Sequence, residues 1–161
     1  MIVTALAAAA VVAGAGPAAA QGACDRLQAL DSFGQIPFGA RLEGMPAGAR
    51  RVSGCEHGLT FAECVIQDAG GVTYSLYDGY VFSKYVVEGD GAYPWGLRPE
   101  DSRAVAARRM RAATGQTARG ILGEDNQAHL RSTFACGDAF GSIFARYRGD
   151  RIVAVGLETP L

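Results

Sequence analysis

The feature that most constrains the fold of this chain is an internal repeat. Three blocks of sequence recur in the same order: residues 37–41 at 94–98, residues 60–64 at 133–136, and residues 71–88, without a gap, at 141–158. In the longest block, Gly71 aligns with Gly141 and Tyr77 aligns with Tyr147. Blocks that recur in order predict one supersecondary unit used twice. We therefore expect Tyr77 and Tyr147 to occupy equivalent places at two hairpin tips.

Each unit reads as a helical segment followed by three antiparallel strands. We expect helices at 25–33 and 99–114, strands at 59–66, 129–136, 143–147 and 152–157, and a hairpin over 71–87. The dipeptide Asp78-Gly79 suits the type I′ turn of that hairpin, because both central residues need a positive φ. The predicted fold class is α+β: two tandem helix-plus-three-strand antiparallel repeats, about 21–90 and 91–161, forming one domain.

Alternation along the 71–87 hairpin separates two faces. The better core face carries Val72, Tyr74, Leu76, Val81, Ser83, Tyr85 and Val87. The opposite face carries Thr73, Ser75, Tyr77, Tyr80, Phe82, Lys84 and Val86. Interfaces are enriched in aromatic residues, so Tyr77, Tyr80 and Phe82 are the candidate binding residues. The alternative is that another element covers these three side chains as a second layer of core.

The N-terminal segment predicts export. Residues 2–20 contain no charged side chain and end in Ala18-Ala19-Ala20, which a signal peptidase accepts. We expect residues 1–20 to be a signal peptide and residues 21–161 to be a single mature domain, periplasmic or secreted, with no stable membrane span after cleavage. An uncleaved membrane anchor and a lipid anchor at Cys24 are the alternatives.

Four cysteines accompany this export signal, and an oxidising compartment favours disulfides. Four cysteines allow three connectivities. Cys55 and Cys64 flank a plausible turn, so we expect them to pair. That choice leaves Cys24 to pair with Cys136.

No motif assigns a chemistry. The net charge is −1, and no run of basic residues is long enough to indicate a nucleic-acid partner. No nucleophile elbow, phosphate loop or dinucleotide fingerprint occurs in the predicted mature chain. His57 lies near Cys55 and Cys64, but its spacing fits no common zinc pattern. We therefore expect no catalytic residue, no metal and no cofactor.

The entry sequence Pro94-Trp95-Gly96, the helix after it and the three-strand meander together resemble the tandem-repeat fold of the β-lactamase inhibitor proteins. They also resemble the related small lipoproteins of outer-membrane barrel assembly. In that family, helices pack on one face of an antiparallel sheet and the other face binds a protein. The resemblance implies a non-catalytic protein-binding module of the bacterial envelope whose partner is another envelope protein. The alternatives are a small periplasmic enzyme and a purely structural module.

Overall fold

The computed structural model describes residues 27–60, 63–122, 127–136 and 139–159. Its sheet contains β1 (Arg50–Ser53), β2 (Glu63–Gln67), β3 (Val72–Tyr77), β4 (Tyr80–Val87), β5 (Arg119–Leu122), β6 (Ala128–Cys136), β7 (Ala139–Arg148) and β8 (Arg151–Glu158). A 3₁₀ turn, η1 (Pro94–Gly96), and the helix α2 (Arg103–Thr114) lie between β4 and β5. The predicted signal peptide and Cys24 fall outside the described residues, and so does the predicted Cys24–Cys136 bond.

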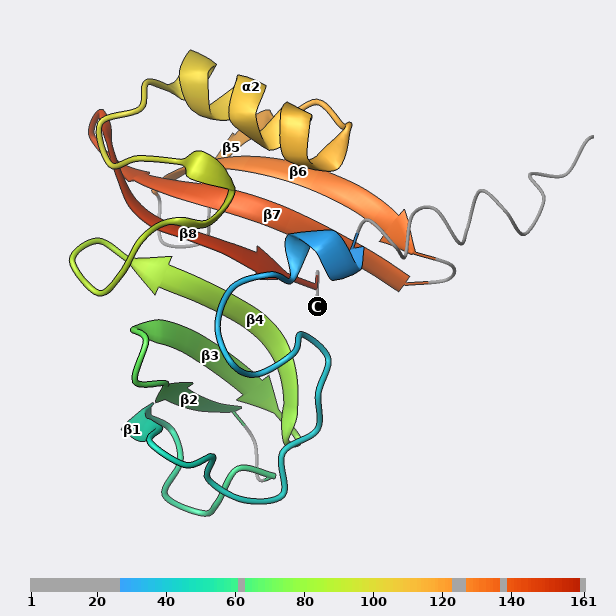
Figure 1. Cartoon of the computed structure of the whole chain (residues 1–161), viewed down its shortest axis with the longest axis vertical. Coiled ribbons are helices and arrows are strands. Elements are labelled where there is room, and N and C mark those ends of the chain that lie inside the picture. Colours follow the sequence, from blue (N-terminus) through green and yellow to red (C-terminus); the bar gives the residue numbers. More distant parts are fainter. Residues whose placement is uncertain (1–26, 61–62, 123–126, 137–138, 160–161) are drawn as a thin grey trace, which may run out of the picture.

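All eight strands form one antiparallel sheet in the order β1-β2-β3-β4-β8-β7-β6-β5 (Figure 1). Each half is a meander of four strands, and the two meanders meet where β4 pairs with β8. The predicted fold class is therefore wrong. The molecule is dominated by one sheet, and α2 is the only helix of seven or more residues in the described part of the chain.

The errors have local causes. The expected helix at 25–33 is helical only at residues 27–30 among those described. Two strands were missed, and both lie at sheet edges. All four residues of β1 are exposed, so no buried alternation marks it. The strand β5, with the sequence RGIL, lies within residues 116–127, which are polar enough to be interpreted as a connection between elements. Internal duplication of the chain stays a prediction.

The helix α2 begins four residues later than predicted. The hydroxyl oxygen of Ser102 accepts a hydrogen bond from the backbone N–H of Val105, which caps the first turn. Pro99 instead belongs to the chain before the helix, and its carbonyl accepts a hydrogen bond from the N–H of Ile152. At the other end, Gly115 has a φ of 72° and ends the helix as predicted. No helix in the described ranges is long and apolar enough to cross a membrane.

One face of the sheet forms the core. Its buried side chains include Ile66, Tyr74, Leu76, Val81, Ile143, Tyr147, Ile152 and Leu157. Over the second half of the sheet, α2 packs on β6 (Figure 1) and buries Ala106 and Met110. Over the first half, residues 30–36 cover the core face, where the N–H of Ile36 donates to the Tyr74 hydroxyl. We call this side the core face.

The hairpin of β3 and β4 has the predicted turn, but the faces of β4 differ from the prediction. Asp78 and Gly79 both have positive φ, and Tyr77 pairs with Tyr80. A β-bulge follows, because Leu76 pairs with Val81 but Ser75 pairs with Ser83. The additional residue, Phe82, shifts the alternation by one. Lys84 and Val86 therefore join the core face, whereas Ser83, Tyr85 and Val87 lie on the opposite one.

Burial of Lys84 requires compensation, since an unpaired charge inside a protein is costly. The Lys84 ammonium is fully buried and lies 2.6 Å from the Asp31 carboxylate. It also donates to the carbonyl of Ile36 and lies 4.6 Å from the centre of the Phe33 ring. This ion pair holds residues 31–36 against the middle of the sheet.

The second hairpin, β7 and β8, does not place Tyr147 where Tyr77 stands. Tyr77 belongs to the last pair before its turn, and its side chain is 59% exposed. Tyr147 lies one pair further from its turn, opposite Ile152, and is only 2% exposed. Because successive residues of a strand face opposite sides, this difference of one residue puts the two tyrosines on opposite faces.

Candidate functional site

The face opposite the core face is the candidate site, and we call it the second face. The residues that the cross-strand register assigns to it include Glu63, Thr73, Ser75, Tyr77, Tyr80, Ser83, Tyr85, Val87, Arg119, Ile121, His129, Arg131, Thr133, Ser142, Phe144, Arg146, Gly156 and Glu158. The described contacts of α2 and of residues 30–36 are with the core face. The second face therefore presents side chains that the core does not use.

Two of the predicted binding residues form an exposed aromatic pair at the β3–β4 turn. Tyr77 and Tyr80 are direct cross-strand partners and are 59% and 48% exposed. The guanidinium of Arg41 lies 5.5 Å from the centre of the Tyr80 ring, a cation–π distance. Phe82 stands apart from this pair, because it occupies the bulge and is half-buried. The structure thus brings together two of the three predicted residues.

Small residues and aromatic rings fill the centre of the second face. Phe144 and Tyr85 flank Gly156, and their ring centres lie 6.3 Å apart. A Cβ atom at Gly156 would lie 2.4 Å from the Lys84 carbonyl oxygen and from Tyr85 Cβ and 2.9 Å from the Phe144 ring, so only glycine fits here. The guanidinium of Arg146 lies 5.8 Å from the centre of the same ring. Burial raises the pKa of the Tyr85 hydroxyl.

Glu158 is the only described carboxylate on the second-half strands of this face. Burial raises its pKa, and the positive charges of Arg131 and Arg146 oppose that rise only in part. Its Oε1 lies 2.5 Å from Nη2 of Arg131. A half-buried carboxylate with a raised pKa is a common feature of functional sites. Here burial beside Ser142 explains the rise, and the ion pair with Arg131 acts against it.

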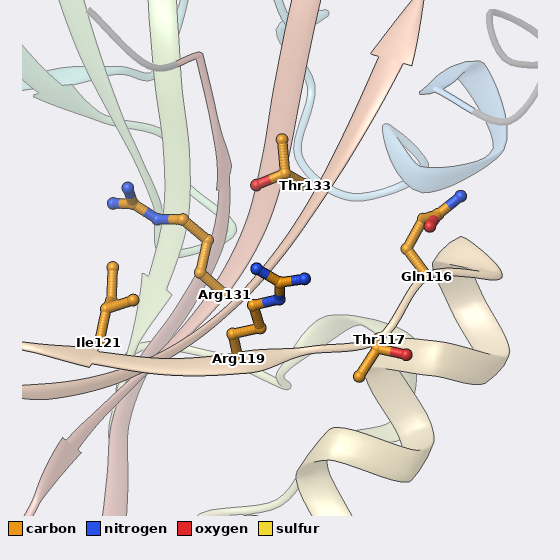
Figure 2. A pocket seen from close by; sticks show the side chains of 6 residues that line it. All are labelled: Gln116, Thr117, Arg119, Ile121, Arg131 and Thr133. Atoms are coloured by element: carbon orange, nitrogen blue, oxygen red, sulfur yellow. The ribbon is translucent and has the colours of Figure 1, made fainter.

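A pocket of about 410 Å³ opens where β5 and β6 meet the loop after α2. Its lining residues are Gln116, Thr117, Arg119, Ile121, Arg131 and Thr133 (Figure 2). Arg119 and Arg131 are direct cross-strand partners, so two guanidinium groups rise from neighbouring positions. The Thr133 hydroxyl lies 3.0 Å from that of Ser142. The described lining holds cations, hydroxyls and an amide, and neither a carboxylate nor a histidine.

The remaining predicted residues lie elsewhere. Cys55 and Cys64 form the predicted disulfide, near β1 and β2. Cys136 ends β6, and its predicted partner Cys24 lies outside the described residues. In the described ranges, no group of three or more histidine, cysteine and acidic side chains is arranged to hold a metal.

Sequence reasoning missed the arginine pocket. One signal was available: along residues 129–133, His, Arg and Thr alternate with Leu and Ser, which predicts a polar face on that strand. The partner strand β5 was not expected at all, so nothing placed Arg119 beside Arg131. Without the pairing of β5 with β6, the sequence alone could not predict the pocket.

Comparisons with known proteins do not identify this chain: no family model, no curated protein and no solved structure matches it.

Proposed function

We propose that this chain is a non-catalytic protein-binding module of the bacterial envelope, periplasmic or secreted, which binds another envelope protein through the second face. The observation that carries the proposal is the exposed pair of Tyr77 and Tyr80. Large aromatic side chains that stay exposed on a sheet supply contact area at a low entropic cost, and such residues dominate binding energy at interfaces.

Three further observations support the proposal. The Cys55–Cys64 disulfide is compatible with an oxidising compartment, as the predicted signal peptide requires. The helix α2 and residues 30–36 pack over much of the core face, which leaves the second face as the more open side of the sheet in the described part of the chain. The pocket on that face offers cations and hydroxyls, which suit contact with polar or acidic groups of a partner.

The test is a pull-down from envelope extract with the tagged chain, the Tyr80→Ala variant and a Tyr93→Phe control. Tyr93 is buried, and its hydroxyl donates to the carbonyl of Ile152, so this substitution changes no exposed side chain. We expect a specific partner that the wild type and the control retain and Tyr80→Ala loses. Equal retention by all three proteins would contradict the proposal.

A further inference from the structure

We infer that the pocket between β5 and β6 is a carboxylate-binding site that takes an acidic side chain of the partner protein. This inference rests on the proposed function for the identity of the ligand. The pocket itself follows from the pairing of Arg119 on β5 with Arg131 on β6.

The first reason is the juxtaposition of two like charges. Arg119 and Arg131 are direct partners on neighbouring strands, and like charges placed opposite each other destabilise a sheet. Arg119 is exposed and forms no ion pair with a described carboxylate. Glu158 offsets the charge of Arg131, and an anion held beside Arg119 would offset the charge that remains. In Figure 2 the guanidinium of Arg119 points into the space that Arg131, Thr133 and Gln116 border.

The second reason is an unused donor. Arg131 is partly buried, and its Nε–H has no hydrogen-bond acceptor among the described residues. Buried polar groups normally find a partner. Nε–H lies on the same edge of the guanidinium as the Nη2 atom that meets Glu158, so the edge left for a ligand is the end that Nη1 and Nη2 form. A guanidinium binds a carboxylate through two parallel N–H donors, a geometry suited to this arrangement.

The third reason concerns the charge of the ligand. Glu158 neutralises one of the two arginines, so the pocket carries a modest positive charge. A singly charged carboxylate balances that charge, whereas a doubly charged phosphate would exceed it. The hydroxyl of Thr133 and the amide of Gln116 add neutral donors, and Ile121 offers an apolar wall for the methylene groups of a Glu side chain.

The fourth reason is access. β5 is the last strand of the sheet, so one of its edges has no strand beside it among the described residues. Extended peptides bind such edges by adding a strand, which points alternate side chains toward one face. A segment with acidic residues at alternate positions would therefore bring a carboxylate to Arg119.

The test uses two synthetic peptides, blocked at both ends and six residues long, one with Glu at alternate positions and one with Gln in their place. Binding to the full chain is measured by fluorescence anisotropy at low salt. We expect the Glu peptide to bind and Arg119→Gln to raise its Kd about tenfold. The reason is that one hydrogen bond between charged groups contributes about as much free energy as a tenfold change in Kd represents. The matched control is Arg108→Gln, an exposed arginine of α2, which should change the Kd less than twofold.

Three results would overturn the inference. Equal affinity for the Glu and Gln peptides would show that the carboxylate is not recognised. An equal loss from Arg108→Gln and Arg119→Gln would indicate only diffuse attraction between charges. Competition by inorganic phosphate at lower concentration than by acetate would indicate a phosphate site.

The pull-down separates this inference from the proposed function. Capture that depends on Tyr80 but not on Arg119 would support the proposed function and contradict the pocket. Glu-peptide binding that depends on Arg119, with no Tyr80-dependent partner in the extract, would support a carboxylate site and contradict the protein-binding role of the aromatic pair.

Discussion

Truncating Tyr80 to Ala should weaken partner binding while it leaves the fold nearly intact. The backbone of this residue is held on both sides: Tyr80 pairs with Tyr77 in β3, and it forms a β-bridge with Arg41. Beside it, the N–H of Val81 donates to the carbonyl of Ala40. These bonds involve only the main chain, so the substitution removes a side chain and leaves the strand pairing in place.

The magnitude follows from the exposure of the ring. Fully burying a large apolar side chain stabilises a fold by about 1.5–3 kcal/mol, and Tyr80 is 48% exposed, so about half of that is at stake. The cation–π contact with Arg41 adds about 0.5–1 kcal/mol at an exposed site. We therefore expect the free energy of unfolding to fall by about 1–2.5 kcal/mol. Truncating a fully buried aromatic residue costs about 3–5 kcal/mol.

The assay pairs urea denaturation with partner binding, and Tyr147→Ala serves as the comparison. Tyr147 is 2% exposed on the core face, so its loss should approach the larger figure. If Tyr80 is an anchor, its truncation should also cost about 2 kcal/mol or more in binding, which is a rise in Kd of roughly thirtyfold. A fall in unfolding free energy as large as that of Tyr147→Ala would mean that Tyr80 belongs to the core, and the binding-face argument would be wrong.

Three further substitutions test the structure. Burial alone would raise the pKa of Asp68, but hydrogen bonds from the Tyr74 hydroxyl and three backbone N–H groups outweigh it and hold the pKa below its ordinary value. A carboxylate whose pKa is lowered in the folded state stabilises the fold above about pH 4, and this stabilisation is lost as the pH falls further. Asp68→Asn should therefore lower the free energy of unfolding by about 1.5–3 kcal/mol at pH 7 and weaken its dependence on pH below about pH 4. Asp31→Asn leaves the buried Lys84 ammonium without its carboxylate, and urea denaturation should show a loss of about 3–5 kcal/mol. Cys55→Ser removes the disulfide, so the free energy of unfolding should fall by about 2–4 kcal/mol and the melting temperature should fall with it. A reductant should destabilise the wild type through this bond but should have no such effect on the variant.

Local signals predicted part of this fold. The β3–β4 turn was predicted because Asp78 and Gly79 tolerate the positive φ that a type I′ turn needs. The end of α2 was predicted because Gly115 suits a left-handed cap. The Cys55–Cys64 bond was predicted from two cysteines on either side of a short turn. Each of these features is decided by residues close together in the sequence.

The edge strands were missed for a related reason. A strand such as β5 has one neighbour and little burial, so its sequence need not alternate. Its pairing is fixed by β6, where Arg119 pairs with Arg131, a residue 12 positions further along the chain. The pocket exists only because of that pairing. Sequence reasoning that treats residues 116–127 as a connection therefore loses both the strand and the candidate carboxylate site.

The bulge at Phe82 explains why the aromatic face could be only half predicted. Unbroken alternation would have put Tyr85 in the core and left Lys84 in solvent, which is the less costly arrangement for a lysine judged from its neighbours alone. The observed arrangement depends on Asp31, 53 residues earlier, whose carboxylate meets the ammonium. The bulge places Tyr85 on the second face, where it lies against Gly156 and Phe144. The ion pair makes this arrangement tolerable because it neutralises Lys84 on the core face, and a distant contact of this kind leaves no local pattern in the sequence of β4.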